Sequence, residues 1–238
     1  MDQPSNQTLE VTLGTTLSRT FSASIAVLIA GLMVLFMVTG GGQSFTTETL
    51  RRQQVMAQPQ RIDTFEVTGP GGQKTSLNTL LAAGGKIWLV DFVYTRCQTV
   101  CSSLGSIYQQ LQAHIEERGL QDKVGLLSIS FDPVNDDAAA LSAYAARMRM
   151  DPGIWQIATL SRWQDRRRLL DAFGIMVVPA PQGEFEHNAA LHVVSSDGRL
   201  VRIIDYQDFK SALDEAVAIT QRDTAARAQN LQNLRAAR

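Results

Sequence analysis

Residues 90–101 read Val90-Asp91-Phe92-Val93-Tyr94-Thr95-Arg96-Cys97-Gln98-Thr99-Val100-Cys101. The apolar run Ile87–Val93 predicts a buried strand that ends just before Arg96, and a helical pattern opens near Cys101. Both cysteines of the chain therefore lie at one strand-to-helix turn. A thiol just before a helix faces unpaired backbone N–H groups and the positive end of the helix dipole. These features, together with the charge of Arg96, favour the thiolate form.

The spacing of the two cysteines allows their sulfur atoms to act together. Three residues separate Cys97 from Cys101, so one helical turn can bring the sulfurs close enough to form a disulfide or to hold one soft metal ion. A small structural disulfide is the alternative, but a bridge that closes so short a loop constrains little of the unfolded chain. We therefore interpret this stretch as a chemical site.

The composition limits the class of protein. The 238 residues leave room for one domain of ordinary size plus appendages, and the net charge of −1 does not suggest binding to nucleic acid or a polybasic membrane patch. Two cysteines cannot form a disulfide framework. Any sulfur chemistry of this protein therefore belongs to the Cys97–Cys101 pair.

One segment near the N-terminus is predicted to span a membrane. After a polar segment at residues 1–20, residues 21–39 run without a charge. In a helix these residues rise roughly 28 Å, close to the hydrocarbon thickness of a bilayer. A cleaved signal peptide is the alternative, but the run is longer than a usual signal core and no clean cleavage site follows it. We favour an uncleaved anchor.

The rest of the chain divides into three predicted parts. A polar linker covers residues 40–60, a folded domain covers residues 61–222, and a tail at 223–238 either extends the last helix or frays. Arg19 before the apolar run and Arg51 and Arg52 after it would place the large domain in the cytoplasm. That bias is too small to decide orientation, since long domains translocate largely regardless of it.

Strands and helices alternate along the folded domain. Strands are predicted at Ile87–Val93, Val124–Ser130, Ile154–Ala158, Ala189–Ser195 and Leu200–Tyr206. Helices are predicted from Ser76 to Leu80, from about Cys101 to Arg118, from a cap within Asn135-Asp136-Asp137 to Met148, from a Ser161 cap to Gly174, and from about Asp208. Residues 176–188 are predicted as a loop. This order indicates an α/β fold with a mixed central sheet flanked by helices, and the position of the cysteines is that of a thioredoxin-like fold.

Three features together resemble the Sco/SenC family of membrane-anchored copper proteins. They are the segment from Phe92 to Cys97 followed by Cys101, the segment Ser128-Ile129-Ser130-Phe131-Asp132-Pro133, and His187 before the last hairpin. The resemblance covers roughly residues 62–218 and the preceding anchor. The chain departs from the family where Gln98 and Ser102 replace prolines after the cysteines, and where Glu186 and Asn188 flank the histidine.

The resemblance implies a specific function. It predicts a thioredoxin-like domain on the outer face of the cell inner membrane, in the periplasm, or facing the mitochondrial intermembrane space. One copper ion, Cu(I) with Cu(II) left open, is then held by Cys97, Cys101 and His187. The implied role is to assist assembly of the binuclear copper centre of cytochrome c oxidase. The implied partners are the oxidase subunit that carries this centre and other copper chaperones or thiol reductants.

The chemistry of these side chains agrees with copper. Cu(I) prefers thiolates and suits two cysteines and one histidine, whereas structural zinc takes four ligands. His192 is the rival to His187, but it lies inside an apolar strand and is expected to pack there. Asp132, before Pro133, is expected to belong to an ordinary turn, and the functional alternatives are that it orients the site or accepts a proton. The run Arg162, Arg166, Arg167 and Arg168 is expected to be a solvated helix face, with docking of an acidic partner as the alternative.

A second function is possible for the same cysteines. In a thiol–disulfide oxidoreductase the thiolate of Cys97 attacks a partner disulfide and Cys101 resolves the mixed disulfide. A copper site needs His187 as a third ligand, whereas a pure oxidoreductase can lose it. Whether the protein is an enzyme is therefore left open, and the copper role is the favoured hypothesis.

Overall fold

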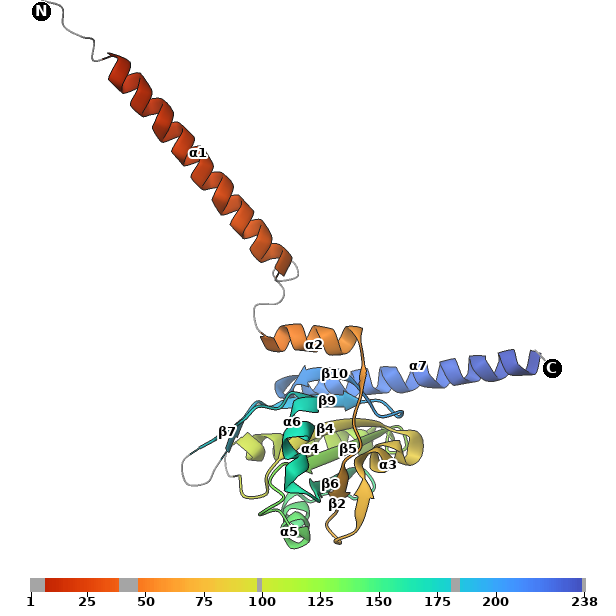
Figure 1. The fold of residues 1–238 in the computed structure, drawn as a ribbon. Coiled ribbons are helices and arrows are strands. Elements are labelled where there is room, and N and C mark those ends of the chain that lie inside the picture. The colour runs from red at the N-terminus through yellow and green to blue at the C-terminus, as the bar shows by residue number, and fades with distance from the viewer. Residues whose placement is uncertain (1–6, 39–46, 98–99, 181–184, 237–238) are drawn as a thin grey trace, which may run out of the picture. The chain divides into compact units, whose positions relative to one another are not determined.

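The fold is described from a computed structural model, which places residues 7–38, 47–97, 100–180 and 185–236 (Figure 1). The chain forms two compact units, residues 1–53 and residues 54–238. The first unit contains α1 (Gln7–Val38) and most of α2 (Thr47–Ala57). Helix α2 therefore occupies part of the range predicted as a linker. The predicted boundaries of the linker at residue 40, of the folded domain at residue 61 and of the tail at residue 223 stay predictions.

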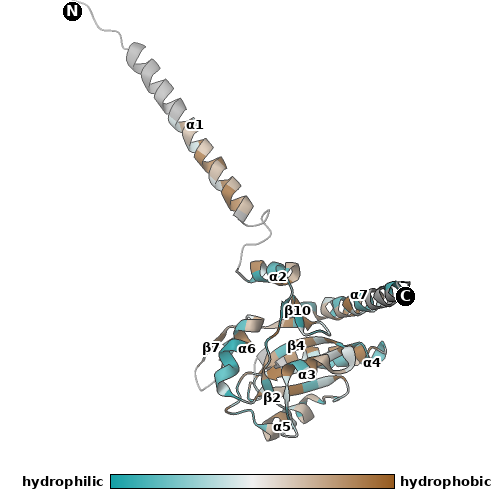
Figure 2. Ribbon diagram, turned by 45° about the vertical axis from the view of Figure 1, so that its right-hand side comes forward, coloured by the Kyte–Doolittle hydropathy of each residue, from teal (hydrophilic) through white to brown (hydrophobic). Residues whose placement is uncertain are grey.

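Helix α1 carries the apolar segment. Its window Thr20–Met37 has a mean hydropathy of 2.3, and none of it is buried against other parts of the chain. Figure 2 shows mostly apolar colour along the part of this helix that it colours. The described residues thus contain one helix that is long and apolar enough to cross a membrane.

The second unit is built on an eight-stranded sheet with the order β1-β10-β9-β4-β5-β6-β2-β3. Its strands are β1 (Gln60–Arg61), β2 (Glu66–Thr68), β3 (Lys74–Ser76), β4 (Ile87–Val93), β5 (Val124–Ser130), β6 (Trp155–Leu160), β9 (Ala190–Val194) and β10 (Arg199–Asp205). The three central strands β4, β5 and β6 are parallel, and the other pairings are antiparallel. The predicted mixed sheet is confirmed.

The central strands are apolar throughout because helices cover both faces of the sheet. Every residue of β4 and of β5 is buried. Val90 and Phe92 face one core cluster with α3 (Leu77–Ala82) and α6 (Arg166–Phe173). Leu89 faces the other with α4 (Val100–Glu117) and α7 (Phe209–Ala236). This burial fixes the register that brings Val93 beside Ser130 at the carboxyl end of the sheet.

The predicted start of α6 is wrong. Ser161 does not cap that helix, because its hydroxyl lies 2.8 Å from the Thr68 hydroxyl on the neighbouring strand. A 3-10 turn at Trp163–Asp165 precedes α6 instead, and Asp165 occupies the cap position. By contrast, Ser76 caps α3 as predicted, since its Oγ accepts a hydrogen bond from the Thr79 amide at 3.0 Å. Asp137 likewise caps α5 (Ala138–Met148).

The segment predicted as a loop contains a separate two-stranded ribbon. Strands β7 (Val177–Pro179) and β8 (Phe185–His187) pair antiparallel, with Val177 opposite His187. We call this pair the β7–β8 ribbon. Each strand has only three residues, and proline and polar residues lie in and around them. The sequence therefore shows no strand pattern here. It carries one of the predicted site residues.

Candidate metal centre

Cys97 lies in the turn that follows β4. Its amide donates a hydrogen bond to the Tyr94 carbonyl oxygen at 3.2 Å, and its half-buried side chain packs against the core. Cys101 belongs to the first turn of α4, as predicted. The side chain of Cys101 and residues 98–99 lie outside the described part of the chain. Backbone geometry therefore confirms the strand-to-helix position of the pair, and the contact between the two sulfurs stays a prediction.

The structure brings His187 close to Cys97. The imidazole is half-buried, with its ring edge-on to Phe131 at 5.3 Å between centroids and its Nδ1 3.1 Å from the Asn188 carbonyl oxygen. Burial lowers the pKa of His187, while the hydrogen bond to Asn188 and the nearby charge of Cys97 act in the opposite direction. The net lowering of the pKa keeps the imidazole neutral at pH 7, which is the form that binds a metal.

Two donors do not make a complete site. Among the described side chains no group of three His, Cys, Asp or Glu residues converges as a metal site. Cys97 and His187 can supply one sulfur and one nitrogen, a donor pair suited to a soft or borderline metal ion. A third donor has to come from outside the described side chains, and Cys101 is the predicted one.

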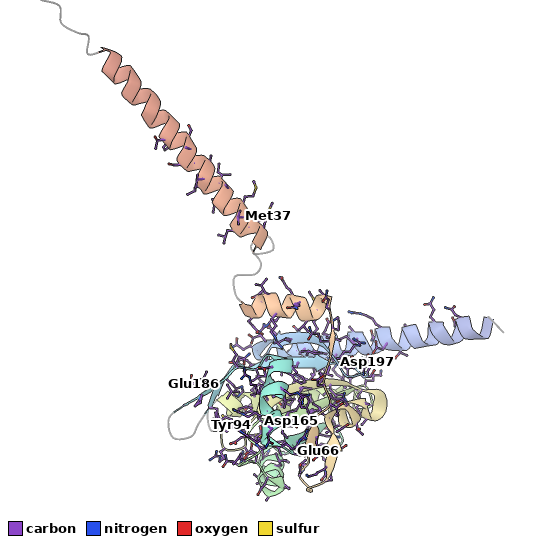
Figure 3. All side chains as sticks on the ribbon, in the orientation of Figure 1. Met37, Glu66, Tyr94, Asp165, Glu186 and Asp197 are labelled. Carbon is purple, nitrogen blue, oxygen red and sulfur yellow. The ribbon has the colours of Figure 1, made fainter. Side chains whose placement is uncertain are left out.

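Tyr94 attaches the β7–β8 ribbon to the strand that precedes Cys97. Its hydroxyl oxygen lies 3.3 Å from the Phe185 carbonyl oxygen and 3.2 Å from the Phe185 amide nitrogen. The rings of Tyr94, Phe131 and Phe185 pack edge to face or tilted at 5.3 to 5.7 Å. Figure 3 labels Tyr94 and Glu186 on the side of the domain where the ribbon lies. This aromatic contact positions His187, two residues after Phe185.

The Asp136 side chain holds the turn before Cys97 through hydrogen bonds. Its carboxylate accepts hydrogen bonds from the Thr95 amide at 2.9 Å, the Thr95 hydroxyl at 2.6 Å and the Ser130 hydroxyl at 2.6 Å. Arg147 donates to the Thr95 carbonyl oxygen at 2.9 Å. Burial raises the pKa of Asp136, although its hydrogen bonds oppose the rise. Both backbone polar groups of Thr95 are thus satisfied by side chains, which fixes the path of the turn.

Asp132 orients Arg96, the neighbour of Cys97. The buried Asp132 carboxylate accepts from Arg96 Nη2 at 3.1 Å and from Asn135 Nδ2 at 2.9 Å. The contact with Arg96 agrees with an orienting role, and the hydrogen bond from the Asn135 amide to the Asp132 carbonyl oxygen at 3.0 Å agrees with the predicted turn. The same ion pair partly neutralises Arg96, so the charge of Arg96 acts less on Cys97 than the sequence alone suggests.

The other histidines and methionines have different surroundings. His192 is buried, with its ring nitrogens 3.3 Å from the Val90 carbonyl oxygen and 3.1 Å from the Phe173 carbonyl oxygen. These contacts leave no ring nitrogen for a metal, and the prediction that His192 packs in its strand is confirmed. His114 lies on α4 and contacts Glu117 at 3.6 Å. Met148 packs against the core, whereas Met176 is 68% exposed.

Several residues around the site were not predicted from the sequence. Phe185, Phe131 and Tyr94 form contacts between segments about forty to ninety positions apart, and no local pattern indicates such contacts. Asp136 is predicted as part of a helix cap, but Asp137 alone caps α5, and Asp136 is buried. The sequence did hold a hint of this role, because Asn135, Asp136 and Asp137 are three possible cap residues and a helix needs only one.

Comparison with known proteins shows relatives of most of the second unit. The SCO1/SenC family model matches residues 54–221. A SCO1 protein homolog of Bacillus subtilis is 28% identical over 176 residues, which are 73% of this chain and 83% of the relative.

Two solved structures share the fold. BsSco, described as a Sco-family cytochrome c oxidase assembly protein with a disulfide switch, matches with a TM-score of 0.59 and 22% identity, over 69% of this chain and 95% of BsSco. Bradyrhizobium japonicum ScoI with copper bound matches with a TM-score of 0.53 and 24% identity, over 68% of this chain and 99% of ScoI. The match of the family model over most of the chain, on a thioredoxin-like fold with the cysteines at its strand-to-helix turn, shows that this chain belongs to the SCO1/SenC family.

Proposed function

We propose that this protein is a copper metallochaperone that binds one copper ion through Cys97, Cys101 and His187. Its role is to assist assembly of the binuclear copper centre of cytochrome c oxidase, so its partner is the oxidase subunit that carries this centre. The observation that carries the proposal is the half-buried imidazole of His187, which lies at the end of β8 near enough to Cys97 to feel its charge. The copper bound to Bradyrhizobium japonicum ScoI and the assembly role of BsSco support it.

The residues around the pair are suited to holding Cu(I) as cargo. Two thiolates and an imidazole form a soft, three-coordinate donor set. The Asn188 carbonyl oxygen can only accept a hydrogen bond, so its contact with His187 Nδ1 favours the tautomer that carries the proton on Nδ1 and a lone pair on Nε2. The Tyr94–Phe185 hydrogen bonds hold the imidazole at the site, and Asp136 holds the turn. A site assembled from a turn and a ribbon can open for transfer, because neither element lies in the central sheet.

A thiol–disulfide oxidoreductase is the second candidate, and the disulfide switch of BsSco favours it. The Cys97 thiolate attacks one sulfur of a partner disulfide, and the other partner sulfur leaves as a thiolate. The Cys101 thiolate then attacks the Cys97 sulfur of the mixed disulfide and releases the second partner thiolate. Two electrons pass to the partner, and this chain ends as a Cys97–Cys101 disulfide. The same step would reduce the cysteines of the oxidase copper centre before copper delivery.

The proposed location follows from the function. Helix α1 anchors the protein in the cell inner membrane by one pass, and the domain of residues 61–222 faces the periplasm. A mitochondrial protein of this kind would face the intermembrane space. Assembly of the oxidase copper centre on that side of the membrane is the reason for this orientation.

Competition for Cu(I) tests the copper site. The full chain in detergent, with its thiols reduced, is titrated against a Cu(I) chelator together with His187→Ala, His192→Ala and Cys101→Ser. We expect one ion per wild-type chain, a loss of affinity of at least about tenfold for His187→Ala and Cys101→Ser, and wild-type affinity for folded His192→Ala. Binding that is indifferent to His187 would reduce the site to a dithiol. Absence of competitive binding would leave thiol exchange as the function.

A further inference from the structure

The arginines at the start of α6 differ in their partners. Three of them form ion pairs with carboxylates: Arg162 with Asp165 at 2.7 Å, Arg168 with Asp165 and Asp63 at 3.2 Å each, and Arg167 with Asp171 at 3.7 Å. Within the described residues Arg166 forms no ion pair of this kind, although the negative charge of Asp132 acts to raise its pKa. A solvated helix face therefore accounts for the other three arginines but not for Arg166.

Aromatic rings hold the guanidinium of Arg166. Its Cζ lies 4.8 Å from the Trp163 ring centroid, 5.3 Å from that of Phe185 and 5.6 Å from that of Phe131. Its Nε donates to the Phe131 carbonyl oxygen at 2.9 Å. Burial lowers the pKa of Arg166, and Asp132 opposes the shift. The cation is thus fixed in place before any partner arrives, and its binding to a partner costs little side-chain entropy.

This cation stands beside the candidate metal centre. Phe131 contacts both the Arg166 guanidinium and the His187 ring, and Phe185 precedes His187 on β8. On the other side, Arg96 adjoins Cys97 and is 53% exposed while it pairs with Asp132. Trp163 is 47% exposed. We call Arg96, Trp163 and Arg166 the arginine rim.

We propose that the arginine rim is the docking surface for the protein that exchanges copper or a disulfide with Cys97, and that an Asp or Glu carboxylate of this partner binds Arg166. The proposal rests on the proposed function and names the chemistry of its partner. The buried carboxylate of Asp132 pairs with Arg96 and acts on Arg166 without pairing with it, so the rim keeps positive charge that an acidic surface complements. Tryptophan and arginine are also the residues that most often dominate binding energy at interfaces. The guanidinium fork matches a carboxylate with two parallel hydrogen bonds.

Arg167 provides a matched control for this proposal. It follows Arg166 on α6, its side chain is 92% exposed, and its contact with Asp171 is long. Arg167→Gln therefore removes the same charge from the same helix without touching the ring cage. Arg166→Lys keeps the charge but loses the planar fork.

The test measures association as a function of salt. The full chain in nanodiscs of zwitterionic lipid is mixed with the soluble domain of the oxidase subunit that carries the binuclear copper centre, from 20 to 300 mM NaCl. We expect Arg166→Gln to slow association about fivefold to tenfold at low salt and to flatten the salt dependence, with rates that converge at high salt. Arg167→Gln should stay within about twofold of wild type, and Arg166→Lys should fall between the two.

Equal effects of Arg166→Gln and Arg167→Gln would overturn the assignment of Arg166. A slower rate for Arg166→Gln with unchanged salt dependence would also overturn it, because that result indicates a packing role. Cu(I) competition on the wild-type chain is measured in parallel. If the wild-type chain does not bind Cu(I), the proposed function is refuted. If it binds Cu(I) but association does not depend on Arg166, only the docking surface is refuted.

Discussion

The Tyr94 hydroxyl lies 3.2 Å from the Phe185 amide nitrogen and 3.3 Å from the Phe185 carbonyl oxygen. One side chain thus joins the segment that leads into Cys97 to the strand that carries His187. Cys97 and His187, two of the three proposed ligands, are ninety positions apart in the sequence. The contact between Tyr94 and Phe185 holds their two segments together in space. The geometry of the site therefore depends on a tyrosine that is not itself a ligand.

Removal of this hydroxyl should weaken the proposed copper site. Tyr94→Phe keeps the ring packing and loses the hydrogen bonds to Phe185, so the β7–β8 ribbon becomes less well positioned. We expect Cu(I) affinity to fall about threefold to tenfold, which corresponds to about 1 kcal/mol for a hydrogen bond. Competition with a Cu(I) chelator measures the change.

Tyr108→Phe is the matched control for Tyr94→Phe. The Tyr108 hydroxyl donates to the Leu89 carbonyl oxygen at 3.1 Å, within the core beneath α4. Its loss should lower the free energy of unfolding by about 1 kcal/mol and leave Cu(I) affinity unchanged. Equal losses of affinity in the two variants would contradict the role assigned to Tyr94.

Two adjacent acidic residues should contribute unequally to stability. Asp136→Ala leaves the Thr95 amide without its partner in a buried turn, so we expect the free energy of unfolding to fall by about 2–4 kcal/mol. Asp137→Ala removes an exposed helix cap, whose side chain accepts from the Ala140 amide at 2.9 Å, and should cost about 1 kcal/mol. Urea denaturation measures both, and equal costs would refute the buried role of Asp136.

The buried carboxyl group of Asp91 should make stability depend on pH. Burial raises its pKa from 3.8 to about 7, although Ser128 and Tyr108 nearby act against the rise. Neither carboxylate oxygen has a hydrogen-bond partner within the described part of the chain. Between these pH values the folded state holds a proton that the unfolded state has released, so the free energy of unfolding decreases as pH rises. The slope is at most about 1.4 kcal/mol per pH unit, and the effect is complete above pH 7.

Asp91→Asn removes this titration. We expect the difference in unfolding free energy between the variant and the wild type to grow in favour of the variant from pH 4 to pH 7 and then to level off. Denaturation at a series of pH values measures it. A difference that is constant with pH would show that Asp91 titrates at the same pH in the folded and unfolded chains.

The orientation of the membrane anchor can be measured directly. Alkaline phosphatase fused after Arg238 should be active in bacterial cells, because this enzyme folds in the oxidising periplasm, and the same fusion without the span Thr20–Met37 should be inactive. An inactive full-length fusion would place the domain in the cytoplasm. That result would refute the proposed location. The distribution of Arg19, Arg51 and Arg52 by itself favours the cytoplasm.

The sequence by itself determined the central sheet and the position of the cysteines. Ile87–Val93 and Val124–Ser130 are predicted with the bounds that β4 and β5 have, because strands buried on both faces are apolar at every position. Cys97 and Cys101 then have to lie at the carboxyl end of β4. The resemblance to the Sco/SenC family, which the family match confirms, singled out His187 in a segment without a periodic pattern.

Only the tertiary structure decided which polar groups support the site. Ser161 bonds across the sheet to Thr68 and does not cap a helix, Asp136 turns inward to Thr95, and Arg166 alone among its neighbouring arginines reaches the aromatic rings beside His187. A local sequence pattern can predict how a side chain interacts with the backbone of its own segment, as in a helix cap. It cannot report a partner from a distant segment, and the contacts that bring the turn of Cys97 and the strand of His187 together, such as Tyr94 with Phe185, are of that second kind.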